Sequence, residues 1–158
     1  MMVELQKPWS FFGIELEAEG RPVQDWYDGL SVQAQEEITD LVQHLRVKTG
    51  SRWDRPDFDP LEGEGGISEI RPDNIRGDSG SKTLRVYGII SYPADLCYTF
   101  LHGTEKEVKN DRDGKNFAKC RLQQLTDESV KRGGPAVHEF DFEGKHYPTI
   151  DARDKRKG

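Results

Sequence analysis

The clearest indication of the fold comes from Ser81 to Asn110, where the sequence reads "SKTLRVYGIISYPADLCYTFLHGTEKEVKN". It holds two apolar runs, "TLRVYGIIS" (83–91) and "LCYTFLHG" (96–103), joined by the short segment "YPAD". Both runs would carry apolar side chains on both faces of a strand, which is typical of strands in the middle of a sheet. We therefore predict that the two runs form the central hairpin of a sheet.

Four patterns precede this hairpin. The alternation in "WSFFGIELEAEG" (9–20) predicts a half-buried strand, and "PVQDWYDGL" (22–30) predicts a short helix that begins near Pro22. A longer helix is predicted after Ser31, a good N-cap, with apolar residues from Ala34 to Leu45 on one face and Gly50 at its end. "ISEIRP" (67–72) predicts a short strand.

Two patterns follow the hairpin. "DGKNFAKCRLQQL" (113–125) has helical spacing, and "RGGP" (132–135) ends that unit. We predict a main domain over residues 1–132 and a C-terminal extension over residues 133–158, with a possible hairpin and a basic, disordered tail. The order of elements predicts an α+β fold, a small, mainly antiparallel sheet with its helices, the N-terminal ones among them, packed on one face.

Composition limits the classes of protein that this chain can belong to. Of 158 residues, 34% are hydrophobic and 33% are charged, and the formal net charge is −6, which argues against generic nucleic-acid binding. The charge is uneven: residues 1–60 hold six Lys/Arg and twelve Asp/Glu, whereas residues 111–158 hold eleven and nine, which leaves room for a local basic face. We expect a cytoplasmic protein with no membrane partner, because no apolar run approaches the roughly 20 residues that cross a bilayer.

Three stretches together resemble the RelE/HigB superfamily, and in particular its phage-derived HigB-like toxins. They are "RPVQDWYDGLSVQAQEEITDLVQHL" (21–45), "GISEIRP" (66–72) and "TLRVYGIISYPADLCYTFLHGTEKEVKN" (83–110), and the likeness covers about residues 9–125. It implies a RelE-like, microbial-ribonuclease-like fold. It also implies a toxin of a type II toxin–antitoxin pair, an endoribonuclease (mRNA interferase) that cuts mRNA on the ribosome and is silenced by a helix-turn-helix antitoxin.

The same resemblance implies where the chemistry lies. A ribose 2′-OH attacks its own 3′-phosphate, so the protein must shift protons and stabilise negative charge, without a metal or a cofactor. The resemblance makes Arg71, Arg85 and His102 the catalytic residues. A guanidinium offers a fork of donors to phosphate oxygens, and an imidazole exchanges protons near neutral pH. The alternatives are a salt-bridged strand arginine and a hydrogen-bonded histidine at a strand end.

Four further residues are candidates for binding RNA: Lys106, Lys109, Tyr87 and Tyr92. The lysines match the basic run of the family, although Glu105 and Glu107 interrupt it here. The tyrosines could stack on bases, or could simply pack in the sheet. The other histidines, His44, His138 and His146, have no metal-ligand spacing with the cysteines, so we expect no metal site.

Two rival hypotheses remain open. The same fold could act without catalysis as a protein-binding module, as a gyrase inhibitor of the ParE kind or an inactive prophage relative does. The acidic balance and the interrupted lysine run favour this class. Alternatively, the chain could be a small phage accessory protein with an unrelated α+β fold.

Overall fold

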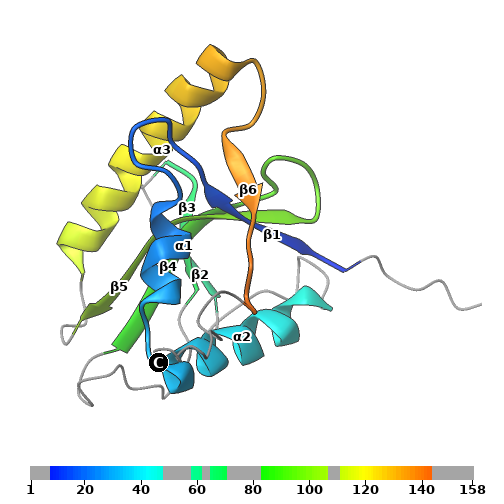
Figure 1. The fold of residues 1–158 in the computed structure, drawn as a ribbon, viewed down its shortest axis with the longest axis vertical. Helices are drawn as coiled ribbons and strands as arrows, with labels where there is room; N and C mark the ends of the chain where they lie inside the picture. Colours follow the sequence, from blue (N-terminus) through cyan, green and yellow to red (C-terminus); the bar gives the residue numbers. More distant parts are fainter. Residues whose placement is uncertain (1–7, 48–57, 62–64, 71–82, 107–110, 144–158) are drawn as a thin grey trace, which may run out of the picture.

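The computed structural model describes residues 8–47, 58–61, 65–70, 83–106 and 111–143. Over these residues the fold is α+β, with three helices and an open, mostly antiparallel sheet of six strands (Figure 1). The elements are β1 (Ser10–Ile14), α1 (Pro22–Asp28), α2 (Val32–Arg46), β2 (Phe58–Pro60), β3 (Ile67–Ile70), β4 (Thr83–Ile90), β5 (Cys97–Lys106), α3 (Arg112–Arg132) and β6 (Val137–Glu139). The strand order is β2-β3-β4-β5-β1-β6.

The predicted central hairpin is confirmed, because β4 and β5 pair antiparallel in the middle of the sheet. A bulge shifts their register: Tyr87 lies opposite His102, whereas Gly88 lies opposite Phe100. Residues directly opposite each other share a face, so the bulge places His102 on the face of Tyr87 and Phe100 on the other face. In a strand without a bulge, Phe100 and His102 are two residues apart and would point to the same face.

The first strand, β1, extends the sheet beyond β5, the second strand of the hairpin. β1 pairs parallel with β5 from Ser10 opposite Cys97 to Gly13 opposite Phe100, and β6 pairs antiparallel with the other edge of β1. The register between β1 and β5 ends at Phe100, although β5 continues to Lys106. Among the described strands, the far half of β5 therefore pairs with β4 alone.

The helices cover both faces of the sheet, so the expectation of helices on one face is wrong. His102 stacks on Phe117 of α3, while the next residue, Gly103, faces Trp26 of α1. Because successive residues of a strand point to opposite faces, α1 and α3 lie on opposite faces of β5. The predicted pattern failed here because periodicity shows that a helix has an apolar face but not which side of the sheet buries it.

The helix ends agree with the sequence-based predictions in part. The Ser31 hydroxyl accepts a hydrogen bond from the Ala34 amide at 3.1 Å, as predicted for an N-cap, but α2 ends at Arg46 with Val47 as its C-cap, not at Gly50. α3 runs past the predicted Leu125 to Arg132 and ends at Gly133, whose φ of +77° favours glycine. The short edge strand β2 was missed, because its three residues lie in a stretch with the composition of a loop.

The described part of the C-terminal extension joins the core. Phe140, which follows β6, is 7% exposed and packs against Phe100 and Tyr27 with ring centroids 5.0 and 5.5 Å away. Residues 144–158, which include the predicted hairpin turn and the basic tail, lie outside the described residues. No helix within the described ranges is long and apolar enough to cross a membrane.

Candidate functional site

The structure pairs the predicted catalytic arginine of β4 with a carboxylate. Arg85 Nη1 donates a hydrogen bond to Glu69 Oε2 of β3 at 3.0 Å, and the two residues are 4% and 2% exposed. An ion pair of this kind is retained in a protein interior because each charge satisfies the other. The Arg85 guanidinium therefore serves the interior of the sheet and does not face solvent.

Tyr87, a predicted RNA-binding residue, is also interior. It is fully buried, and its hydroxyl donates a hydrogen bond to Asp111 Oδ2 at 3.1 Å. Burial, and then the nearby carboxylates of Glu69 and Asp111, raise the pKa of Tyr87 well above its usual range. The other Asp111 oxygen accepts the Gly114 amide at 2.9 Å, so this carboxylate caps α3 and binds the helix to β4. Tyr87 thus positions α3, and its buried ring has no exposed face on which an RNA base could stack.

His102 lies next to this buried layer, at its border with solvent. The half-buried imidazole lies between two rings: Phe117 at 4.5 Å between centroids with planes 16° apart, and Tyr87 at 6.3 Å and 12°. The bulge in β5 supplies this orientation. His102 also lines a hollow of the surface.

That hollow lies beside the far half of β5, between α1 and α3. Its volume is about 160 Å³, and its lining consists of Pro22, Val23, Trp26, Leu101, His102, Gly103, Phe117 and Arg121. Phe117 is 47% exposed at its rim. The volume suits one side chain of a partner or one planar ring, and aromatic walls beside a cation are common where proteins bind one another or stack on bases.

Arg121 is the residue of this hollow that the sequence analysis missed. Its guanidinium lies 4.9 Å from the centre of the Phe117 ring, and Nη2 pairs with Glu19 Oε1 at 3.0 Å. The residue is 7% exposed, and within the described residues its Nη1 has no hydrogen-bond partner. Burial lowers the pKa of Arg121, while Glu19 opposes that effect. The i, i+4 spacing from Phe117 was the available signal, because both residues were already assigned to a helix.

The remaining candidates do not join His102. The Tyr92 hydroxyl lies 3.3 Å from Ser129 Oγ, twelve residues along α3 from Phe117, which corresponds to about 18 Å of helix. Lys106 ends β5, but its side chain lies outside the described residues, as do Arg71 and Lys109 entirely. The structure therefore brings His102 next to Tyr87, and Arg85 lies two residues along β4 on the same face, where it pairs with Glu69.

Chemically, the hollow can bind a planar or aromatic group and can offer it an imidazole and a buried guanidinium. Within the described ranges, no group of three or more His, Cys, Asp or Glu side chains is placed to hold a metal ion. Comparison of the chain with protein-family models, with curated proteins and with solved structures gave no match.

Proposed function

We propose that this chain is the toxin-like member of a type II toxin–antitoxin pair and that it acts by binding another protein rather than by cutting RNA. The three stretches that resemble the RelE/HigB superfamily support the first part. The single observation that carries the second part is the buried ion pair between Arg85 and Glu69. A guanidinium that is already neutralised inside the sheet cannot stabilise the extra negative charge of a phosphorane.

Three further features support a binding role. The hollow between α1 and α3 has Trp26, Phe117 and Arg121 in its lining, which are residue types enriched at the centres of protein interfaces. The far half of β5, which lines this hollow, extends past its pairing with β1. The net charge of −6 also fits a protein partner better than RNA, since binding to phosphates depends on positive charge.

The test is induction of the chain in a bacterial host, alone and together with the product of the neighbouring gene. We expect primer extension on total mRNA to show no new 5′ ends after induction, and we expect the neighbouring product to co-purify with the chain. A Trp26→Ala/Phe117→Ala double variant should keep its fold and lose capture of a target protein. New cleavage ends that vanish in His102→Ala would overturn the binding proposal.

A second candidate function rests on His102. Its half-buried imidazole lines an open hollow together with Arg121, so a ribosome-dependent endoribonuclease would have a proton-transfer group and a different arginine from the expected one. This alternative predicts mRNA cleavage that His102→Ala abolishes and Arg121→Lys weakens. The matched control is His44→Ala, an exposed histidine on α2 that should leave cleavage unchanged.

A further inference from the structure

The segment from Ala136 to Glu143, here called the C-terminal strap, lies along the edge of β1, as a bound peptide would. It follows Gly133, Gly134 and Pro135 at the end of α3, pairs with the edge of β1 as β6, and continues to α2 (Figure 1). The Phe140 amide extends the pairing by donating to the Phe11 carbonyl at 3.0 Å. The strap is thus an edge segment attached to the domain by a glycine-rich link.

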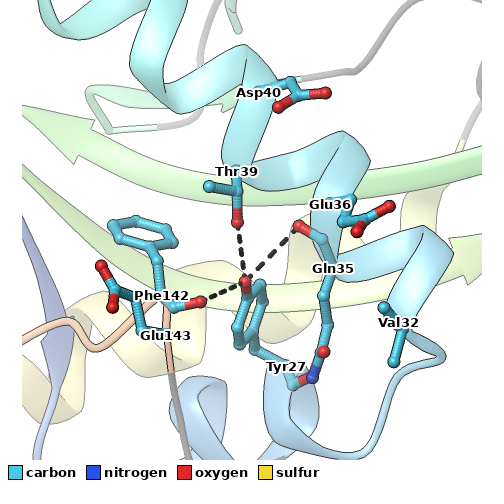
Figure 2. A pocket seen from close by; sticks show the side chains of 8 residues that line it. All are labelled: Tyr27, Val32, Gln35, Glu36, Thr39, Asp40, Phe142 and Glu143. Carbon is cyan, nitrogen blue, oxygen red and sulfur yellow. Dashed lines mark hydrogen bonds between the residues drawn. The ribbon is translucent and has the colours of Figure 1, made fainter. Parts of the chain in front are cut away.

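Side chains of α1 hold the backbone of the strap. Gln24 Nε2 donates to the Asp141 carbonyl at 2.8 Å, and the Asp141 amide donates back to Gln24 Oε1 at 2.9 Å. The Tyr27 hydroxyl donates to the Phe142 carbonyl at 2.8 Å, and Figure 2 shows this contact next to those with Thr39 and Gln35. Sites that bind extended peptides use backbone hydrogen bonds of this kind for affinity and pockets for alternate side chains for specificity.

The alternate side chains of the strap are two phenylalanines that fill an aromatic groove. Phe140 packs on Phe100 at 5.0 Å between centroids, and Phe142 packs on Phe11 at 6.1 Å and on Tyr27 at 5.9 Å. Asp141 lies between them. The groove therefore fits an extended segment in which two aromatic residues flank one other residue.

His138 is a buried polar residue of the strap whose hydrogen bonding is incomplete within the described residues. It is 7% exposed, its Nδ1 lies 2.9 Å from the Glu139 carbonyl oxygen, and Nε2 has no hydrogen-bond partner within the described residues. The ring fits only because residue 13 is glycine: a Cβ there would lie 2.7 Å from Nε2. Burial lowers the pKa of His138, and Arg21 adds to the effect, while the hydrogen bond to the Glu139 backbone and the carboxylates of Glu15 and Asp25 oppose it.

We propose that the C-terminal strap is an exchangeable ligand, released when His138 is protonated, and that the vacated groove binds an extended aromatic–x–aromatic segment of a partner protein that has no histidine at the position of His138. A proton on Nε2 would add a charge where the strap offers no acceptor, so acid favours the undocked state. The glycine link lets residues 136–143 leave while α3 and the central hairpin stay folded. This inference is independent of the toxin proposal.

Hydrogen exchange of the full chain at about pH 7.5 and about pH 5.5 tests the release. After correction for intrinsic rates, we expect the amides of Phe140 and Asp141 to exchange at least about tenfold faster at the lower pH, with β4 amides unchanged. His138→Gln should remove this difference, whereas His44→Gln, at an exposed site, should keep it. Equal protection at both pH values, or a difference that survives in His138→Gln, would overturn the proposal.

Binding in trans tests the groove. A labelled peptide of residues 135–143 carrying H138Q, which keeps its affinity in acid, should bind the full chain about tenfold more tightly at about pH 5.5 than at about pH 7.5, because the fraction of open groove rises. The same peptide carrying F140S and F142S should not bind. A chain with Phe142→Ser in its own strap should bind the peptide at neutral pH, because its groove is open while the groove residues are unchanged, whereas Gln123→Ala, which removes an i, i+4 amide–carboxylate contact on α3, should not lead to binding. Fast strap exchange without peptide binding at either pH would refute the groove as a binding site.

Discussion

Arg85 of β4 and Glu69 of β3 form a diagonal ion pair across adjacent strands, with Nη1 and Oε2 3.0 Å apart and both side chains at most 5% exposed. The pair lies on the face of the sheet that α3 covers, beside Tyr87. The Arg85 guanidinium was expected to contact a phosphate. In the structure it pairs with the Glu69 carboxylate in the protein interior.

Removing one member of this pair should be costly. Glu69→Leu leaves the Arg85 guanidinium buried without its carboxylate, so we expect a loss of about 3–5 kcal/mol in the free energy of unfolding, measured by urea titration. The double variant Glu69→Leu/Arg85→Met should recover most of that loss, because neither charge then remains. A double variant as unstable as Glu69→Leu alone would show that the sheet depends on something other than charge compensation.

Tyr87→Phe should destabilise the chain more than Tyr92→Phe does. The first change removes a buried hydrogen bond to the carboxylate that caps α3, at a cost of about 1–3 kcal/mol. The second removes a 3.3 Å contact at a half-buried site and should cost less than about 1 kcal/mol. Chemical denaturation of both variants gives the comparison, and equal losses would contradict the role of Asp111 as a link between β4 and α3.

Gly103→Ala should disturb the hollow beside His102. An added Cβ would overlap the Trp26 ring, which must move, so we expect a loss of about 1–3 kcal/mol and a shifted tryptophan emission. Gly29→Ala is the matched control, since its nearest neighbours lie 3.6 Å from the added Cβ and its φ of −86° suits alanine. If Gly103→Ala were as stable as the wild type, Trp26 would not be fixed against β5.

The free energy of unfolding should fall as the pH drops below the ordinary histidine value of 6.5, in part because of His138. Its pKa in the folded state lies below that value, so between the two values the unfolded chain binds more protons than the folded chain does. The contribution is complete above pH 6.5 and is lost towards the lower, folded-state pKa. The free energy of unfolding is measured against pH for the wild type and for His138→Gln, and the difference between the two curves is the contribution of His138. Identical curves would show that His138 makes no such contribution.

The sequence by itself determined the elements whose signals are local. Ser31 capped α2 as predicted, the apolar runs on either side of "YPAD" became β4 and β5, and the helical spacing around Phe117 became α3. These predictions succeeded because capping and hydrophobic periodicity depend on residues only a few positions apart.

The contacts of each candidate side chain depend on tertiary packing and could not be predicted from the sequence. The sequence placed Arg85 on a strand, but its partner Glu69 came from pairing across a separation of sixteen residues. Arg121 reached the hollow beside His102 because α3 packs on the face opposite to α1, and a single bulge at Leu101 turned His102 towards α3. Long-range pairing and the choice of sheet face follow from how all the apolar surfaces are buried together, and no local pattern encodes that sum.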